Sequence, residues 1–352
     1  MKTMKKCIAA VLALVMALSL SLTAFAATAD NVKQYNTYTF LGDSIAAGHS
    51  LDDYYTYGDY GDGHLIKDSY AQIVADAVGA EDVRCDAMQG VNSSALRYLL
   101  DEDYTMDAMT QMLVPMLTSY RYNAASYAVL RTQIQQDIAD SDLITIGVGS
   151  NDMMYAAMIC LFKAQGINMG YGKSIEEREV FTTLKTALAE NDGDLAAAIL
   201  QAIEFLEKVD KAGQLVNVLI SDLNDAYNNY MTNMNVIIEK VKALNPDAEV
   251  VLVGMYNPLR DMKISDDLPI SIGHIADLSI MKYNVYLQTA AQKAGMDYAC
   301  VWNAEVYECF TVETMMNFTN GSFFADISHC VHPTVNGHAY MAKQILGVLP
   351  TA

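Results

Sequence analysis

Five short apolar runs recur along the chain, and segments with helical spacing separate them. The runs lie at 37–41, 83–87, 143–149, 249–255 and 298–302, and β-branched and aromatic residues are frequent in them. Continuous apolar strands of this kind are typical of a parallel sheet that helices cover on both faces. The alternation of strands and helices therefore predicts an α/β fold with a doubly wound parallel sheet.

Two of the predicted helices have clear end signals. One begins at Ser69, a preferred N-cap residue, and ends at Gly79, a preferred residue at helix C-termini. The other runs over 223–244, where apolar residues stand alternately four and three positions apart on one helix face. The Asn-Pro pair at 245–246 is expected to end this helix just before the fourth strand.

The connection between the third and fourth strands is far longer than a single helix requires. Nearly a hundred residues separate Asp152 from Glu249, whereas a whole strand–helix–strand unit needs about 30. An amphipathic pattern at 195–206 lies within this stretch. We expect a helical cap, an insertion at about 153–220, over the carboxyl ends of the strands, where α/β folds keep their sites. Its Met and Tyr residues either form the core of the cap or line an apolar pocket.

Residues 1–26 have the features of a secretory signal peptide. Lys2, Lys5 and Lys6 form a basic start, an apolar run follows, and an Ala-Phe-Ala site stands at 24–26. The apolar run is short for a membrane span, so we expect cleavage rather than a retained anchor. The sequence thus predicts an extracellular, secreted protein with no membrane span, whose mature part, 27–352, is one domain with the helical cap as its insertion.

The mature chain is strongly acidic. The formal net charge of the full sequence is −20, and removal of the three lysines of the signal peptide makes it about −23. Such a charge repels nucleic acid and anionic membrane surfaces. We therefore expect that the protein binds no nucleic acid. We also expect it to be a monomer.

The mature chain has an odd number of cysteines, so they cannot all be paired within one molecule. A chain of this length also does not need disulfides for stability. Cys309 and Cys330 are the first pair to test, because both lie in the C-terminal loop region.

Polar residues follow several of the predicted strands. Ser44 comes after the first strand, Gly90 after the second and Asn151 after the third. His332 lies in the C-terminal loop region. The carboxyl ends of neighbouring parallel strands share one edge of a sheet, so these residues can meet there. A serine hydroxyl needs a histidine to take its proton, and a developing oxyanion needs hydrogen-bond donors, so this set is suited to ester cleavage.

The same blocks resemble those of the GDSL, or SGNH, hydrolase family. The matching residues are Gly42-Asp43-Ser44, Gly90, Gly149-Ser150-Asn151-Asp152 and His332-Pro333, in the order of the family and over most of the mature chain. The resemblance implies a flavodoxin-like three-layer sheet, which is the SGNH hydrolase fold. It implies nothing about the helical cap, which lies outside the common pattern.

The resemblance also implies roles for individual residues. Ser44 is the nucleophile, and His332 is the general base and then the general acid. The N–H groups of Ser44 and Gly90 and the side-chain amide of Asn151 form the oxyanion hole. Asp43 and Asp152 are interpreted as structural residues that shape their loops.

One position departs from the family pattern. The family usually has an Asp three residues before the catalytic histidine, and here that position is His329. A triad needs a group that orients the imidazole and stabilises its cation. Either Asp326, the nearest upstream acid, bends toward His332, or a backbone carbonyl near His329 holds the ring and the site is a Ser-His dyad.

A metal site is the rival interpretation of the C-terminal loop. His329, Cys330, His332 and His338 offer plausible ligands at close spacing. Pro333 follows His332 directly, however, and disfavours a helical ligand pair. The stretch at 147–152 is also no dinucleotide fingerprint, because Asp152 stands where the third Gly belongs. We expect no metal and no other cofactor.

The sequence therefore predicts a secreted serine esterase that hydrolyses carboxylic esters through an acyl-enzyme. The candidate substrates, which are also the expected partners, are small-molecule or glycan esters: acetylated carbohydrates, cell-wall acetyl esters or short acyl lipids. Two alternatives remain open: a catalytically impaired secreted binding protein of the same fold, and an acyltransferase that uses the same residues. The tyrosines at 54, 55, 57 and 60 form either a mobile loop over the site or a surface strand.

Overall fold

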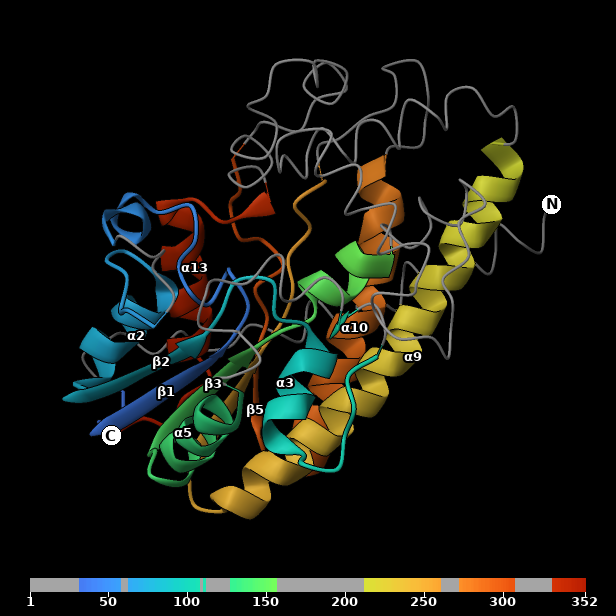
Figure 1. Cartoon of the computed structure of the whole chain (residues 1–352). Coiled ribbons are helices and arrows are strands. Elements are labelled where there is room, and N and C mark those ends of the chain that lie inside the picture. Colours follow the sequence, from blue (N-terminus) through green and yellow to red (C-terminus); the bar gives the residue numbers. More distant parts are fainter. Residues whose placement is uncertain are drawn as a thin grey trace.

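A five-stranded parallel sheet forms the centre of the molecule, with the order β2-β1-β3-β4-β5 (Figure 1). The computed structural model describes residues 32–57, 63–107, 110–111, 127–156, 212–260, 272–307 and 331–352. The strands are β1 Thr37–Gly42, β2 Asp82–Ala87, β3 Leu143–Gly147, β4 Glu249–Val253 and β5 Asp297–Ala299. The prediction of a doubly wound parallel sheet is confirmed.

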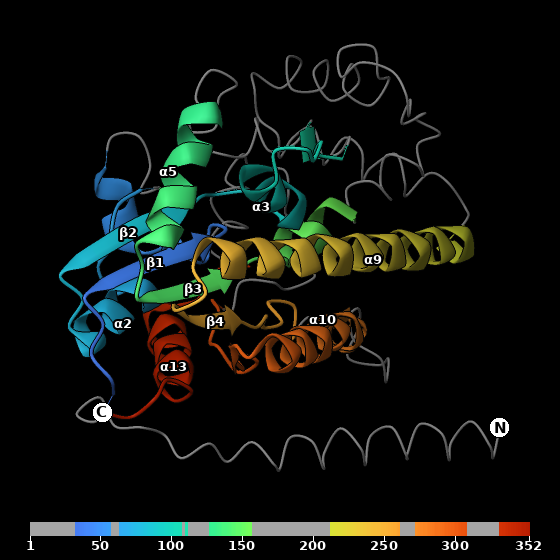
Figure 2. The same cartoon turned by 90° about the horizontal axis from the view of Figure 1, so that it is seen from below.

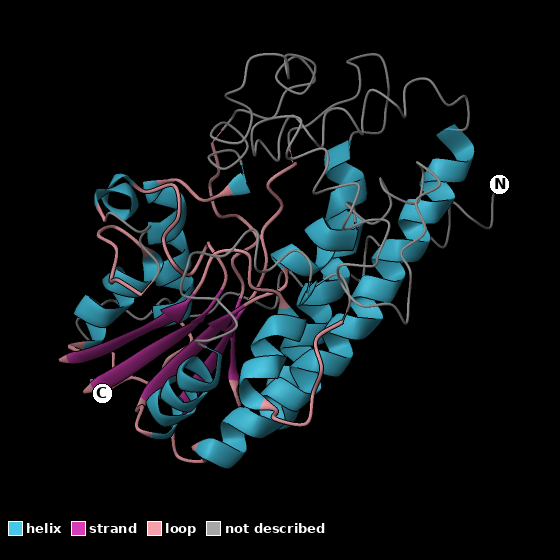
Figure 3. Ribbon diagram, viewed as in Figure 1, coloured by secondary structure: helices cyan, strands magenta, loops and turns pink. Residues whose placement is uncertain are grey.

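Helices cover both faces of the sheet, as Figure 3 shows. One face packs against α2 and α13, and the other against α3, α5, α9 and α10; Figure 2 shows α2 and α13 on the side opposite α3 and α5. The helices are α2 Tyr70–Val78, α3 Ser93–Leu100, α5 Tyr127–Ala139, α9 Ala212–Leu244, α10 Ile272–Ala294 and α13 Val335–Leu346. Within the described ranges, no helix is both long and apolar enough to cross a membrane.

The strand order places a switch point next to β1. The chain moves from β1 to β2 on one side and then returns to β3 on the other. Right-handed crossovers in the two directions put α2 on one face of the sheet and α3 and α5 on the other. Ligand sites of open α/β sheets lie beside such a reversal, at the carboxyl ends of the strands. The ends of β1 and β3 are therefore the expected place for the site.

The predicted caps of α2 and the predicted C-terminal end of α9 are confirmed. The Ser69 hydroxyl accepts a hydrogen bond from the Gln72 N–H at 3.1 Å, and Gly79 has a left-handed φ of 68° at the other end of α2. Helix α9 ends at Leu244, just before the Asn-Pro pair. It begins at Ala212, well before the predicted start, so 212–220 of the predicted cap belong to this helix. Residues 157–211, the remainder of the cap, lie outside the described residues.

Three strands, β3, β4 and β5, end earlier than predicted, and β4 shows one reason. After Val253 the chain bends away from the sheet, and the side chain of Asn284 on α10 takes over the backbone groups of Met255. Its Oδ1 accepts from the Met255 N–H at 2.7 Å and its Nδ2 donates to the Met255 carbonyl at 2.7 Å. A buried side chain thus replaces a neighbouring strand, and hydrophobicity alone does not reveal this change of partner.

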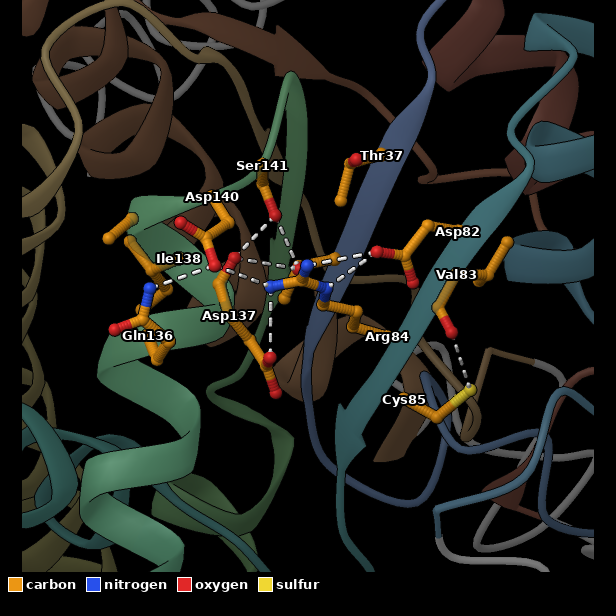
Figure 4. Close-up of polar contacts among 12 residues, drawn as sticks. Thr37, Asp82, Val83, Arg84, Cys85, Gln136, Asp137, Ile138, Asp140 and Ser141 are labelled. Atoms are coloured by element: carbon orange, nitrogen blue, oxygen red, sulfur yellow. Dashed lines mark hydrogen bonds and ion pairs between the residues drawn. The ribbon is translucent and has the colours of Figure 1, made fainter.

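An ion-pair cluster joins edge strand β2 to the end of α5 (Figure 4). The Arg84 guanidinium lies 2.9 Å from Asp82 on its own strand, 3.0 Å from Asp137 and 3.4 Å from Asp140. Carboxylates are unfavourable at a helix C-terminus, where the helix dipole is negative. Arg84 offsets this charge and makes the exposed edge of the sheet a poor partner for another strand.

Candidate active site

Ser44 lies in a tight turn directly after β1. The Asp43 N–H still donates to the Gly147 carbonyl of β3 at 3.2 Å, and the chain then turns away from the sheet. Gly42 is required at the end of β1, because a Cβ there would collide with the Gly147 carbonyl oxygen. Ser44 is 9% exposed, so its hydroxyl lies in a largely desolvated place at the switch point.

His332 meets Ser44 across 288 residues of sequence. Its Nε2 lies 2.8 Å from the Ser44 Oγ, and the imidazole is 6% exposed. This distance is that of a direct hydrogen bond, and it is the separation at which a histidine can take a serine proton. Sequence reasoning predicted both residues, and the structure brings them together.

The backbone on either side of His332 is held by contacts with two other segments. The Tyr256 hydroxyl, just after β4, donates to the carbonyl of Val331 at 2.7 Å. Burial raises the pKa of Tyr256, so this hydroxyl keeps its proton and remains a donor. After the histidine, the Thr334 N–H donates to the Glu305 carbonyl at 3.0 Å. The placement of His332 thus depends on the carboxyl edge of β4 and on the segment after β5.

Two side chains from the segment after β3 form hydrogen bonds with the backbone of the Gly90 loop. Gly90 has a left-handed φ of 76°, and the Tyr155 hydroxyl donates to its carbonyl. The Asn151 amide donates to the carbonyl of the next residue, Val91, at 2.9 Å. One N–H of the Asn151 amide is used in this way, and the second can serve another acceptor. The backbone amides of Gly90 and Ser44 and this side-chain amide all follow adjacent strands, at the same edge of the sheet.

Tyr155 is a residue that the sequence reasoning missed. It stands four positions after Asn151 on the same helical turn, and both lie on its buried side. The spacing of four is the only signal in the sequence, because it places two residues on one helix face. The partner, the carbonyl of Gly90, belongs to a different loop and has no side chain to indicate the contact.

Asp43 and Asp152 flank the site as buried carboxyl groups. Asp43 accepts a hydrogen bond from the Ile45 N–H at 2.9 Å, and Asp152 accepts one from the Ser93 N–H at 2.9 Å and another from the Ser93 hydroxyl. These contacts shape the turn that carries Ser44 and fix the start of α3, as the structural interpretation of both residues predicts. Burial raises the pKa of both carboxyls from 3.8 to about 7.

This raised pKa predicts a stability change with pH. The unfolded chain ionises Asp43 near 3.8 and the folded chain only near 7, so the neutral carboxyl stabilises the fold at low pH, and this contribution is lost as the pH rises toward 7. Asp43→Asn keeps the acceptor for Ile45 but cannot ionise. The free energy of unfolding of Asp43→Asn, relative to that of the wild type, should therefore increase by as much as about 4 kcal/mol from pH 4 to pH 8. Urea unfolding across that range measures it.

An exposed aspartate provides the control for that experiment. Asp103→Asn removes the same charge from the surface, so its difference from the wild type should change little with pH. A free-energy difference for Asp43→Asn that is as flat as the control would contradict the prediction.

The predicted orienting group of His332 lies outside the described residues. Asp326, His329 and Cys330 all belong to 308–330. The choice between Asp326 and a backbone carbonyl near His329 therefore stays open, and so does the predicted pairing of Cys309 with Cys330.

His338 is a core residue of α13. Its Nδ1 accepts a hydrogen bond from the Tyr70 N–H at 3.2 Å, and its ring is fully buried. Burial and the nearby His332 lower the pKa of His338 to about 3, so this imidazole is neutral. In the part of the chain that is described, no three His, Cys, Asp or Glu side chains cluster as metal ligands would.

The tyrosine segment beside the site forms neither a strand nor an irregular loop over 52–56. It is a short 3₁₀ helix, η2 Asp52–Thr56, in which Tyr54 is fully buried and Tyr55 is 49% exposed. Tyr54 therefore belongs to the core, and Tyr55 presents its ring to solvent. Tyr60 lies outside the described residues.

Comparison with known proteins shows the family of the chain. The model of the GDSL-like lipase/acylhydrolase family matches residues 38–345. The chain belongs to this family. Ser44, Gly90, Asn151 and His332 all lie within the part that matches the GDSL-like model. No curated protein matches the chain in a sequence comparison.

Several solved structures are similar to this GDSL-like chain. An extracellular lipase from Streptomyces rimosus is 14% identical, with a TM-score of 0.41 over 89% of this chain and 97% of its own. A phospholipase A1 from Streptomyces albidoflavus is 15% identical, with a TM-score of 0.44 over 87% and 95%. An acetylxylan esterase from Geobacillus stearothermophilus is 13% identical, with a TM-score of 0.40 over 90% and 95%.

Proposed function

We propose that this GDSL-like protein is a secreted esterase that hydrolyses carboxylic esters through a covalent acyl-enzyme on Ser44. The observation that carries the proposal is the 2.8 Å contact between the Ser44 Oγ and the His332 Nε2 at the switch point of the sheet. A protein that only binds its ligand has no need of this contact, so it favours catalysis over the binding-protein alternative.

The mechanism follows from the positions of the side chains. His332 takes the Ser44 proton at Nε2 while the Oγ attacks the ester carbonyl. The negative charge that develops on the carbonyl oxygen is stabilised by N–H groups of Ser44, Gly90 and Asn151. The His332 imidazolium then protonates the leaving alcohol, and an acyl group remains on Ser44. In the second half, His332 activates water, which releases the acid.

The substrate is proposed as an acetylated carbohydrate or a short acyl lipid. The Tyr55 ring, which contacts His49 and is 49% exposed, presents an aromatic surface to solvent, and such a surface can contact either class. Transfer of the acyl group to a sugar or alcohol would use the same residues. Product analysis with and without such an acceptor separates transfer from hydrolysis.

The test of the proposal is covalent labelling with a fluorophosphonate, read by peptide mass spectrometry on the purified mature chain. We expect one adduct, on Ser44, and turnover of p-nitrophenyl acetate by the unlabelled protein. Competition with longer p-nitrophenyl esters and with acetylated xylan then ranks the substrate classes. A folded protein with neither adduct nor turnover would overturn the esterase proposal and leave the binding protein as the better interpretation.

Asn151 provides a separate prediction for the oxyanion hole. We expect Asn151→Ala to lower kcat by about 10²–10³-fold with little change in KM, because the lost N–H serves the transition state and not the bound ester. Steady-state kinetics on p-nitrophenyl acetate measure the effect.

The matched control for Asn151→Ala is Tyr155→Phe. It removes the hydrogen bond to the Gly90 carbonyl but leaves the Asn151 amide in place, so its loss in kcat should be clearly smaller. Full activity in Asn151→Ala would show that this amide does not bind the oxyanion.

A further inference from the structure

A second imidazole packs against His332 at the site. The ring centroids of His49 and His332 are 4.5 Å apart, with an angle of 34° between the planes. His49 is 4% exposed, so both rings are buried together. Nothing in the family pattern that identified Ser44 and His332 assigns a role to His49.

His49 belongs to the same turn as Ser44. Its backbone N–H donates to the Ser44 carbonyl at 3.0 Å, and its Nδ1 lies 3.2 Å from the Ser50 hydroxyl. Tyr54 packs on the His49 ring at a centroid distance of 4.9 Å, and Tyr55 at 5.7 Å. The position of the His49 ring is thus fixed by the backbone hydrogen bond to Ser44 and by the rings of Tyr54 and Tyr55, in addition to its contact with His332.

The residues on each side of His49 have left-handed backbone conformations. Ser50 has a left-handed φ of 78°, which is uncommon for a residue other than glycine, and Gly48 has a φ of 76°. A Cβ at Gly48 would also collide with Ile66. Such strain persists only where surrounding structure enforces it, and it is concentrated at functional sites. In this turn the His49 ring lies against that of His332.

We propose that His49 is a positioning residue for His332 in the esterase reaction; this inference rests on the proposed function. A hydrogen bond through Nε2 fixes one atom of the imidazole, and contacts on the face of the ring restrict how the ring tilts about that atom. The stacked His49 ring occupies the space into which His332 would tilt, so the His332 Nε2 stays aimed at the Ser44 Oγ. Because Ser44 and His49 share one turn, the position of the His49 ring relative to the Ser44 Oγ is fixed by that turn.

Two substitutions of His49 distinguish the effect of its ring from the effect of its nitrogen atoms. His49→Phe keeps a flat ring of similar size, and we expect its kcat to stay within about threefold of the wild type. His49→Ala removes the ring, and we expect kcat to fall by about 10²-fold, because a displacement of about 1 Å in a reacting group costs this much. KM should change less than threefold in both, since His49 is assigned to the support of His332 and not to binding of the ester.

Tyr57, the residue directly after η2, provides the matched control. Tyr57 stacks on His64 at a centroid distance of 3.9 Å, and no ring contact joins it to His332 among the described residues. Tyr57→Ala disturbs the segment after η2 without removing the His49 ring, so its kcat should equal that of the wild type. A similar loss in Tyr57→Ala would attribute the effect to general damage to the segment and would overturn the proposal.

A double-mutant cycle tests whether His49 acts through His332. If it does, His49→Ala should cost nothing more in a His332→Ala background, measured as residual turnover at high enzyme concentration. An equal loss in both backgrounds would overturn the proposal, and so would a change in KM alone.

Crystal structures of the variants give a readout that does not depend on turnover. We expect the Nε2–Oγ distance to lengthen beyond hydrogen-bond range in His49→Ala and to be kept in His49→Phe. If the wild type hydrolyses no ester, the proposed function fails. The Nε2–Oγ distance then tests by itself whether His49 positions His332, and an unchanged distance in His49→Ala overturns the inference. If the wild type is active and His49→Ala has full kcat, only the inference fails.

Discussion

Replacement of Ser44 by alanine is expected to lower kcat for ester hydrolysis by about 10⁶-fold, to the level left by binding and oxyanion stabilisation alone. In the proposed mechanism the Oγ bonds to the acyl carbon, and it lies 2.8 Å from the Nε2 of His332. KM should remain near that of the wild type, because the hydroxyl contributes little to binding of the ester. Steady-state kinetics and fluorophosphonate labelling measure both effects.

A second buried serine is the control for this substitution. Ser69→Ala removes the N-cap hydroxyl of α2 and should cost about 1 kcal/mol of stability, with kcat unchanged. The comparison distinguishes loss of the nucleophile from loss of folded protein. A Ser44→Ala protein that retained more than one per cent of the wild-type kcat would exclude Ser44 as the nucleophile.

The sheet could be predicted because its information is local. The central strands β3 and β4 are mostly apolar, and in β1 every residue is buried. Serine at the start of α2 and glycine at its end are equally local signals. The switch point then follows from topology, since residues after β1 and β3 must share an edge. For this reason Ser44 and Asn151 could be placed near each other from the sequence alone.

The supports of the site could not be predicted in the same way. Tyr256, Tyr155 and His49 each act on a backbone group or a ring that lies in another segment. Their partners are carbonyls of Val331 and Gly90 and the face of His332, and none of these leaves a pattern in the sequence near the supporting residue. A tyrosine after a strand and a histidine in a turn are compatible with many positions, and only the packed fold decides among them.

The early ends of β3 and β4 have the same kind of cause. Apolar residues continue past both ends, so hydrophobicity predicts longer strands. In the structure the Tyr230 hydroxyl of α9 donates to the Val148 carbonyl at 3.1 Å, and Asn284 binds the backbone of Met255. These side chains let the backbone leave the sheet without unpaired polar groups. The bends at the carboxyl edge, which form the site, therefore depend on long-range contacts from α9 and α10.

Replacement of His332 by alanine is expected to have an effect as large as that of Ser44→Ala, about 10⁶-fold in kcat. Without the imidazole, the Ser44 hydroxyl has no base at 2.8 Å and remains a weak nucleophile. The leaving alcohol also loses its proton donor. Fluorophosphonate labelling of Ser44 should disappear in parallel, because the reagent reports on an activated serine.

Exposed His64 supplies the control, because it stacks on Tyr57 and makes no described contact with Ser44. His64→Ala should retain full kcat and labelling. Turnover in His332→Ala within tenfold of the wild type would mean that another group takes the serine proton.

The double variant is the decisive comparison, because residues that act as one unit have losses that do not add. Ser44→Ala with His332→Ala should be no slower than either single variant, since removal of the nucleophile already leaves the base without a proton to take. If the double variant were slower by the product of the two losses, Ser44 and His332 would contribute independently. The 2.8 Å contact would then be structural, and the acyl-enzyme would need a different nucleophile.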